Sequence, residues 1–274
     1  MTRMLGRALI ALAAYAVALL FLLPYIEMLI TALKPAGELY QIPAEYLPST
    51  FQWDNFITVW QAAPVASYLR SSVVIAAFST LVVLVVSLPA AYYSARHRFR
   101  GRNLFLMLVL VTQMFAPTAL VIGIFREVVA VGLSDSYLGL IIVNAAFNLA
   151  FSVWIMSGYF ASIPVELEEA AYIDGCSSLG ALRRVTLPLA LPGIITAVIF
   201  TFIAAWNEFV VALTLAQSTS VQPLTVGVTT FIGQYQVAWQ YLFATSLIAI
   251  VPVVILFAAI ERWLVGGLTA GGVK

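Results

Sequence analysis

The side chains best suited to contact a molecule in water lie in one segment, residues 166–188, between two long apolar stretches. Its charges are four carboxylates and two guanidinium groups: Glu166, Glu168, Glu169, Asp174, Arg183 and Arg184. Charged groups gathered in this way suit ion pairs and charge-assisted hydrogen bonds with a partner. In a chain that is otherwise almost entirely apolar, the segment is predicted to face water and to offer a binding surface.

Catalytic chemistry has little support in the remaining residues. A single cysteine, Cys176, excludes an internal disulfide, and a single histidine, His97, excludes most histidine-based metal sites. The sequence contains neither H-E-x-x-H nor G-x-S-x-G. It contains no Gly-Lys pair, so a P-loop for ATP is also absent. We therefore predict no catalytic residue, no metal site and no cofactor bound by this chain.

The composition indicates a protein whose solvent is the lipid bilayer. Apolar residues make up 63% of the 274 residues and charged residues only 9%, whereas a soluble domain carries roughly 25% charged residues. The net charge of +1 gives no basic surface for nucleic acid. The predicted fold class is an all-α integral membrane protein, built as one domain over residues 1–274.

Six apolar stretches are long enough to cross a bilayer, which takes about 20 residues per helix. They lack the alternation of a membrane barrel strand, so they are predicted to be helices. The stretches are Ala8–Leu33, Ser71–Ala95, Leu104–Phe125, Leu138–Phe160, Leu189–Leu215 and Tyr241–Trp263. Prolines within them are expected to kink or interrupt the helices; they are Pro24, Pro89, Pro117, Pro192 and Pro252.

The distribution of Lys and Arg predicts which side each loop faces. Six spans place both termini on one side, and basic residues concentrate on the cytoplasmic side of a membrane. Ten basic residues would then face the cytoplasm: Arg3, Arg7, Arg96, Arg98, Arg100, Arg102, Arg183, Arg184, Arg262 and Lys274. Only Lys34, Arg70 and Arg126 would fall on the other side. Both termini and the loop 161–188 between spans four and five are therefore predicted to be cytoplasmic.

The charged segment is predicted to fold as two short helices joined at a glycine. Its glutamates suit the first turns of a helix, where carboxylates interact favourably with the helix dipole. Gly175 suits a C-terminal cap because glycine adopts positive φ without strain. Ser177 or Ser178 would cap the second helix, and Pro188 would end it before the fifth span. The alternative is a solvated loop that only connects two spans.

The spacing within this segment resembles the cytoplasmic signature of ABC-importer permeases. That signature is E-A-A, three residues, glycine, nine residues, isoleucine, one residue and L-P. The stretch from Glu169 to Pro188 matches it except at Val185, which replaces the usual isoleucine. In that family the segment forms a coupling helix that docks in a groove of the ATPase subunit. The resemblance implies coupling roles for Glu166, Glu169, Ala170, Ala171, Asp174, Gly175, Leu187 and Pro188.

Other stretches are similar to the carbohydrate branch of this family, close to its smaller, maltose-type permease. They are Ala146–Phe151, Ser162–Ala171, Trp206–Phe209 and Gly266–Lys274. The chain as a whole looks most like the second permease of actinobacterial trehalose importers. The implied function is a permease subunit of an ATP-driven importer for a di- or oligosaccharide such as trehalose, forming half of the translocation pathway. The implied location is the bacterial inner, or plasma, membrane, crossed several times.

The same resemblance implies a set of partners. ATP and Mg would be bound by a separate nucleotide-binding ATPase dimer, and a homologous second permease would complete the pathway. An extracytoplasmic solute-binding protein would deliver a neutral sugar, and membrane lipid would surround the spans. In maltose-type relatives the glycine-rich tail reaches the ATPase interface, which implies a contact for Thr269, Gly271, Gly272 and Lys274. The alternative for this tail is a frayed end.

The carboxylate of Glu208 lies well inside a predicted span, where an ionisable group indicates function by default. Trp206 and Asn207 beside it suit stacking on a sugar and hydrogen bonding to it, so the three are predicted to line the translocation pathway. The structural alternative is that Glu208 pairs with a polar group or with backbone. Asn144 and Asn148 share one helix face, and for them bonding between helices is favoured over substrate contact.

The segment 217–240, predicted to lie outside, carries no charge but is rich in hydroxyl and amide side chains. Such groups suit a neutral polyol. In maltose-type relatives the corresponding loop contacts the solute-binding protein, which implies the same contact here. The alternative is an ordinary polar connection.

The main alternative function is an ion-coupled secondary transporter. Such proteins often place charges at the membrane midplane and contain paired discontinuous helices in two repeats. Here few carboxylates lie inside the predicted spans and no internal repeat is evident. An ATP-driven importer subunit is therefore the favoured prediction.

Overall fold

The computed structural model describes residues 2–43, 45–97 and 99–270, with side chains at residue 7 and over residues 9–43, 45–97 and 99–261. The secondary structure of this part of the chain is helical, and its one strand-like feature is an isolated bridge between Ile232 and Val237. The all-α fold class is confirmed.

The helices follow one another along these ranges with short connections. The α-helices are α1 (Thr2–Ala32), α2 (Asn55–Ala62), α3 (Val65–Arg96), α4 (Arg102–Thr112), α5 (Pro117–Ala130), α6 (Tyr137–Ser162), α7 (Glu166–Ile173), α8 (Ser178–Ala181), α9 (Leu187–Leu189), α10 (Leu191–Trp206), α11 (Val210–Leu215), α12 (Leu224–Gly227) and α13 (Trp239–Ala270). Two 3-10 turns lie at Ala36–Tyr40 and Val228–Phe231, and a π-helical turn lies at Leu182–Thr186.

Four helices contain continuous stretches long and apolar enough to cross a membrane: Leu9–Ala32, Val65–Arg96, Tyr137–Ser162 and Trp239–Glu261. Two bent pairs of helices bring the number over the described residues to six when each pair counts as one span. The predicted six-span fold agrees with this upper number. Pro24, Pro89 and Pro252 lie inside continuous helices, so none of these three prolines interrupts its helix.

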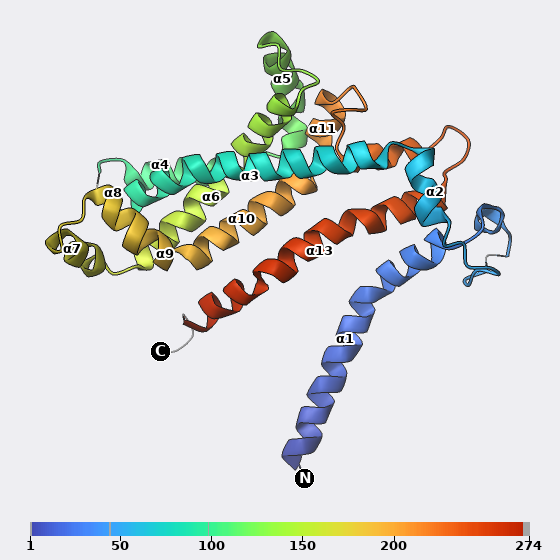
Figure 1. Ribbon diagram of the computed structural model, residues 1–274, viewed down its shortest axis with the longest axis horizontal. Coiled ribbons are helices and arrows are strands. Elements are labelled where there is room, and N and C mark those ends of the chain that lie inside the picture. Colours follow the sequence, from blue (N-terminus) through green and yellow to red (C-terminus); the bar gives the residue numbers. More distant parts are fainter. Residues whose placement is uncertain (1, 44, 98, 271–274) are drawn as a thin grey trace. The chain divides into compact units, whose positions relative to one another are not determined.

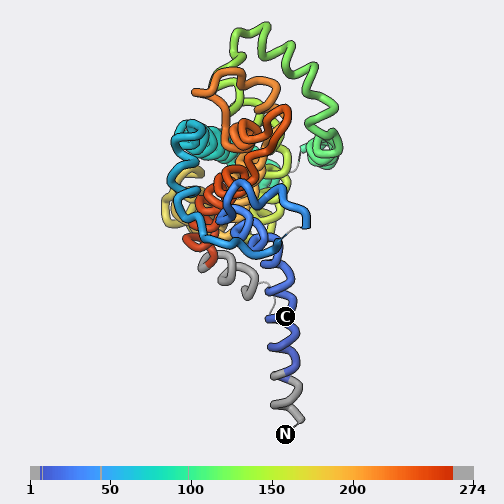
Figure 2. Tube along the Cα trace, turned by 90° about the vertical axis from the view of Figure 1, so that its right-hand side faces the viewer, coloured from blue at the N-terminus to red at the C-terminus, as the bar shows by residue number. Residues whose placement is uncertain are grey.

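The third predicted span, Leu104–Phe125, is broken. Its two parts, α4 and α5, are green in Figure 2 and meet at an angle of 95°. The cause is Pro117, which occupies the first turn of α5 and has no N–H with which to continue α4. The residue before a proline avoids the helical region, and Ala116 is accordingly extended, with φ −66° and ψ 134°. The interruption predicted at Pro117 is confirmed.

The fifth predicted span, Leu189–Leu215, is divided twice. The helical run Ser178–Leu189 meets α10 at 73°, with Ala190 between them. α10 then ends at Trp206, and α11 begins only at Val210. The bend lies beside Pro192, where a kink was predicted, and the separate short helix α11 was not predicted.

The chain divides into two compact units, Met1–Val65 with Val228–Val251, and Ala66–Gly227 with Pro252–Lys274. In the first unit, the Asn55 amide at the start of α2 donates to the Ala32 carbonyl at the end of α1, at 2.8 Å. The second unit contains the charged segment. The description of residues 1–274 as one domain stays a prediction.

Long helices form the core of the second unit, where α3, α6 and α10 run alongside one another (Figure 1). Hydroxyl groups join α3 to α6, because Ser79 donates to the Ile141 carbonyl at 3.3 Å and Ser87 bonds to Ser152 at 2.8 Å. Small hydroxyl residues let membrane helices approach closely and bond across the contact. Buried serines recur along α3 at seven- or eight-residue spacing: Ser72, Ser79, Ser87 and Ser94.

Candidate functional site

The charged segment lies at one end of the second unit, where α7 follows the end of α6 (Figure 1). The two faces of α7 differ in burial. Its exposed face carries Glu166, Glu169, Ala170 and Ile173. Glu168 and Ala171 lie on the opposite face and are buried. This division follows from the helical repeat, because positions three, four and seven residues apart share a face.

Ala171 differs in burial from the other residues predicted for coupling, and its coupling role stays a prediction. Its methyl group packs inside the chain, so Ala171 helps to seat α7 and is not open to a partner. The other residues predicted for coupling are more accessible. Asp174, Gly175 and Pro188 are exposed, and Leu187 is half-buried.

Gly175 forms the predicted elbow between two helical pieces. Its φ is +83°, in the left-handed region that glycine adopts without strain. The N–H of Gly175 donates to the Tyr172 carbonyl at 3.0 Å, and the N–H of Cys176 donates to the Ala171 carbonyl at 2.9 Å. This pair of bonds is the Schellman arrangement that ends a helix at glycine. Ser177 then caps α8, its hydroxyl accepting a backbone N–H of the first turn at 3.2 Å.

Glu168, only 3% exposed, is the centre of a hydrogen-bonded group that we call the Glu168 cluster: Glu168, Tyr92, Arg96 and Thr186. Arg96 Nε and Nη2 each lie 2.8 Å from Glu168 Oε1. Thr186 donates to the same oxygen at 2.7 Å, and Tyr92 donates to Oε2 at 2.9 Å. Arg96 Nη1 also donates to the Ile163 carbonyl, beyond the end of α6, at 2.9 Å. The cluster therefore joins α7 to α3, to the end of α6 and to the π-helical turn.

The cluster keeps the Glu168 carboxylate ionised. Burial by itself raises the pKa of Glu168, because it disfavours the charged form. The hydrogen bonds from Thr186, Arg96 and Tyr92 and the positive charge of Arg96 outweigh burial, so the pKa of Glu168 lies below its ordinary value. A buried carboxylate paired in this way is costly to leave without its partner.

A π-helical turn links the elbow region to α10. In it the N–H of Leu187 donates to the Leu182 carbonyl, five residues earlier. Pro188 follows and has no N–H to donate, and the helical bonding resumes at Ala190, whose N–H donates to the Thr186 carbonyl at 2.8 Å. Thr186, the last residue of the turn, is fully buried and belongs to the Glu168 cluster. Such turns are frequent at functional sites.

The exposed apolar side chains on this surface were not predicted from the sequence. Leu167 and Ile173 on α7 and Leu179 on α8 are exposed, and Ile173 is 87% exposed. Large apolar side chains gathered beside charges mark protein contacts. The sequence held the signal, because Ile173 follows Glu166 by seven positions and therefore shares its face.

Trp206 and Asn207, predicted to line the pathway, have different environments. Trp206 is 5% exposed and stacks on Phe202 with 5.7 Å between ring centroids. Its ring therefore packs in the core of the chain, and its contact with a sugar stays a prediction. Asn207 is exposed just after the end of α10.

Glu208 bonds to backbone. Its Oε1 accepts the N–H of Val211 at 2.8 Å, and its Oε2 accepts the N–H of Ala212 at 2.9 Å. The carboxylate thus caps α11, where the first N–H groups lack partners within the helix. This geometry matches the structural alternative, and a pathway role for Glu208 stays a prediction.

The amide groups of α6 also differ from expectation. Asn144 donates to the Leu140 carbonyl at 2.9 Å, and Asn148 donates to the Asn144 carbonyl at 2.8 Å. Both bonds stay within α6, because each amide reaches back one turn. The bonds between α3 and α6 come from serines instead.

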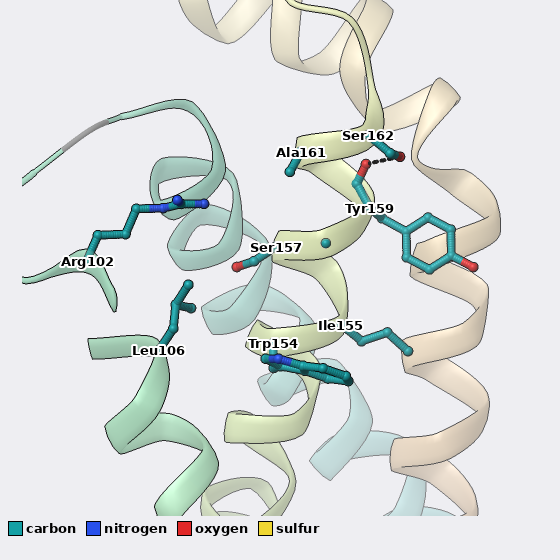
Figure 3. A pocket seen from close by; sticks show the side chains of 9 residues that line it. Arg102, Leu106, Trp154, Ile155, Ser157, Tyr159, Ala161 and Ser162 are labelled. Carbon is teal, nitrogen blue, oxygen red and sulfur yellow. Dashed lines mark hydrogen bonds between the residues drawn. The ribbon is translucent and has the colours of Figure 1, made fainter. Parts of the chain in front are cut away.

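A groove of about 470 Å³ lies between α4 and the last turns of α6. In Figure 3, Arg102 and Leu106 line it from the side of α4, and Ser157 points towards them from α6. Trp154, also on α6, lines the groove and is 46% exposed. An accessible aromatic ring beside a few polar groups is the usual lining of a small-molecule site. The sequence does not single out Trp154, because this residue lies inside a long apolar run.

Comparison with known proteins identifies the family. Residues 87–269 match the family model described as binding-protein-dependent transport system inner membrane component. The chain belongs to this family. The matched range of the permease includes the whole charged segment and every residue of the Glu168 cluster.

Two curated relatives resemble the permease over nearly its whole length. The trehalose/maltose transport system permease protein MalG of Thermococcus litoralis is 32% identical, over 98% of both chains. The trehalose transport system permease protein SugB of Mycobacterium tuberculosis is 32% identical, over 92% of this chain. The predicted resemblance to maltose-type permeases is confirmed, and the chain is a membrane-embedded permease subunit of a sugar ABC importer.

A solved structure agrees with this assignment. A chain from a bacterial ABC transporter involved in the import of the acidic polysaccharide alginate matches with a TM-score of 0.79 and 25% identity. The match covers 95% of the permease and 96% of that chain. These comparisons give the ion-coupled alternative no support, and the relatives are permease subunits rather than enzymes.

The predicted tail contact of the permease involves the end of the chain. Thr269 lies in the last turn of α13. Gly271, Gly272 and Lys274 lie outside the described residues. The contact of this tail with an ATPase therefore stays a prediction.

Proposed function

We propose that the permease passes a di- or oligosaccharide across the bacterial inner membrane and forms half of the translocation pathway beside a homologous second permease. A separate ATPase dimer binds ATP and Mg and drives transport, with α7 and its elbow docked on it. The observation that carries this proposal is the pair of contrasting faces on α7: one is exposed, and the other is held by the Glu168 cluster.

The exposed face of α7 suits a groove in another protein. Ile173 supplies an apolar centre, and Glu166, Glu169 and Asp174 supply charges around it. An apolar centre with a polar rim is the usual anatomy of a protein interface. A helix held on its inner face moves with the spans, whereas a loop that only connects two spans would bend. These features favour coupling over the connecting-loop alternative.

The substrate we propose is a neutral sugar, with trehalose as the specific candidate. Its support is the names of the relatives MalG and SugB, which both include trehalose. Trp154 in the groove and Asn207 after α10 are exposed, so we assign them contact with the sugar in passage. An aromatic face and an amide suit a neutral sugar ring.

The segment after α11 is proposed to meet an extracytoplasmic solute-binding protein. Asp135, just before α6, holds the start of this segment, because its Oδ1 accepts the N–H groups of Gln217 and Ser218 at 2.9 Å each. The hydrogen bonds from Ser218 and Gln217 lower the pKa of Asp135. A segment fixed at its start favours a binding surface over an ordinary polar connection.

Cys176, the only cysteine of the chain, provides the test of the coupling surface. It lies in the elbow and is half-buried. With the second permease present, we expect a membrane-impermeant maleimide to label it in inside-out vesicles but not in intact cells. When the ATPase subunit is also present, it should co-purify with the permeases and block the labelling of Cys176. Cells that carry the complete transporter should take up radiolabelled trehalose, and cells without this chain should not.

Thr219→Cys in a Cys176→Ser background supplies the control for sidedness, because residue 219 is exposed and is proposed to face outward. Labelling of Cys176 in intact cells would overturn the proposed orientation. Full labelling of Cys176 in a complex that retains the ATPase would overturn docking at the elbow. Uptake by the lone chain, driven by an ion gradient, would favour the secondary transporter.

A further inference from the structure

Three glutamates stand close together in α7, but their surroundings differ. Glu166 and Glu169 are exposed, whereas Glu168 is 3% exposed. A docking contact needs an accessible side chain, so Glu168 cannot serve as one. Its partners are all residues of this chain: Arg96, Tyr92 and Thr186.

We infer that Glu168 is a positioning residue that makes α7 move as one body with the end of α3 and with the helical run that leads to α10. The inference rests on the proposed function, because it concerns how the motion of a docked α7 reaches the spans. When the Glu168 cluster is broken, α7 stays docked on the ATPase, but the turns that flank it absorb the motion.

One arm of the Glu168 cluster leads into α3. Arg96 is the last residue of α3, and Tyr92 lies one turn earlier on the same face. Both donate to Glu168, and Arg96 also donates to the Ile163 carbonyl at 2.9 Å. The guanidinium group thus spans the connection between α6 and α7. It fixes where α7 begins as well as where its inner face lies.

The second arm leads into α10. Thr186 ends the π-helical turn, and only the short α9 and Ala190 separate it from α10. Because the hydroxyl of Thr186 bonds to Glu168 at 2.7 Å, α7 is fastened to this run beyond the glycine elbow. Movement of α7 is therefore transmitted to the 73° bend before α10 through the bond between Glu168 and Thr186 as well as through Gly175.

A single oxygen serves both arms. Glu168 Oε1 accepts from Arg96 and from Thr186, while Oε2 accepts from Tyr92. In Glu168→Gln, Oε1 is replaced by a neutral oxygen or by an N–H donor, so the bonds to Arg96 and to Thr186 are both disturbed. Arg96→Lys keeps the positive charge but loses the planar guanidinium group, whose nitrogens bond to Glu168 and to the Ile163 carbonyl at the same time.

The experiment compares Glu168→Gln with the wild type in the complete transporter, reconstituted in vesicles with its solute-binding protein. ATP hydrolysis and sugar uptake are measured on the same vesicles. We expect uptake per ATP to fall by about fivefold or more, the lower end of coupling between separate sites. The ATPase subunit should still co-purify in full. Glu127→Gln, at an exposed position on α5, is the matched control and should leave the ratio unchanged.

Further variants separate positioning from folding. Tyr92→Phe removes one hydroxyl without changing shape, so the complex assembles even if Glu168→Gln does not. It should lower uptake per ATP less than Glu168→Gln, and Arg96→Lys should lower it comparably to Glu168→Gln. Glu169→Gln, on the docking face, should instead weaken retention of the ATPase.

Two results would overturn the inference. One is a normal ratio of uptake to ATP in every assembled variant of the Glu168 cluster, with only the yield of complex reduced, because the cluster would then serve folding alone. The other is a loss of ATPase binding in Tyr92→Phe equal to that in Glu169→Gln. Failure of the wild type to retain an ATPase would instead overturn the proposed function, and it is read from the same preparations.

Discussion

Burial rather than residue type separates the roles of single residues in α7. Glu168 and Glu169 are adjacent and chemically identical, but each step along an α-helix turns the side chain by about 100°. One carboxylate therefore points into the protein and meets Arg96, while the other faces water. The same rotation divides Ala170 from Ala171.

Gly175→Ala tests the elbow at this scale. An added Cβ would meet nothing within 4 Å, so the effect comes from the backbone alone. Alanine at φ +83° carries strain of about 1 kcal/mol, which glycine avoids. We expect the thermal midpoint of the complex to fall and uptake to fall with it. Gly175→Asn should be milder, because Asn tolerates the left-handed region.

Gly123→Ala is the matched control. An added Cβ there also meets nothing within 4 Å, but Gly123 lies inside α5 without a positive φ. Alanine in a helix interior is favoured over glycine by roughly 0.5–1 kcal/mol, so this change should leave the midpoint unchanged or raise it. An equal loss in both variants would show that the elbow does not depend on its backbone conformation.

The helix breaks in the third and fifth spans lie beside residues that favour them locally. Pro117 breaks the third span because it lacks an N–H and forces Ala116 out of the helical region. The fifth span stops at Trp206, and Glu208 caps the short helix that follows. Apolar composition sets which stretches are in the membrane, whereas Pro117 and Glu208 set where α5 and α11 begin.

Glu208→Ala tests the second break. It leaves the N–H groups of Val211 and Ala212 without their carboxylate partner. The loss of such a cap costs about 0.5–2 kcal/mol. We expect a lower thermal midpoint for the complex, with reduced uptake as a consequence. Both quantities are measured on the purified, reconstituted transporter.

Glu208→Gln keeps one side-chain oxygen and separates the two roles of this residue. If Glu208 only caps α11, the variant should transport nearly as well as the wild type. Slower uptake at an unchanged midpoint would instead support the pathway role predicted from the sequence.

The acid stability of the whole molecule should reflect two carboxylates at opposite ends of α6. The pKa values of Asp135 and Glu168 both lie below their ordinary values, which are about 3.9 and 4.3. The folded chain therefore binds fewer protons than the unfolded chain. Stabilisation from each is complete above its ordinary pKa and is lost as the pH falls through the lower folded pKa.

We expect the thermal midpoint of the complex to stay level from about pH 8 to pH 5 and to fall below that. Asp135→Asn and Glu168→Gln should each lower the level part and make the acid decline shallower. A decline between pH 7 and pH 5 that these two variants remove would contradict the lowered pKa values. Glu127→Gln again serves as the control.

The order of helices and the location of the charged segment followed from the sequence. Long apolar runs have few alternatives to membrane helices, because backbone groups in lipid must bond within their own segment. Gly175 and Ser177 signalled the elbow and the cap, because their chemistry acts over a few neighbouring residues. The family resemblance rested on the same local spacing.

Only the tertiary structure paired Glu168 with Arg96, 72 residues earlier in the chain, and buried Trp206 and Ala171. It also turned the amides of α6 back on their own helix and left the α3 contact to serines. The sequence thus determined which long stretches are apolar and helical and which loop carries charge, since those depend on local composition and periodicity. The partner of each buried polar group depends on which helix faces which, and that is fixed only when the helices pack.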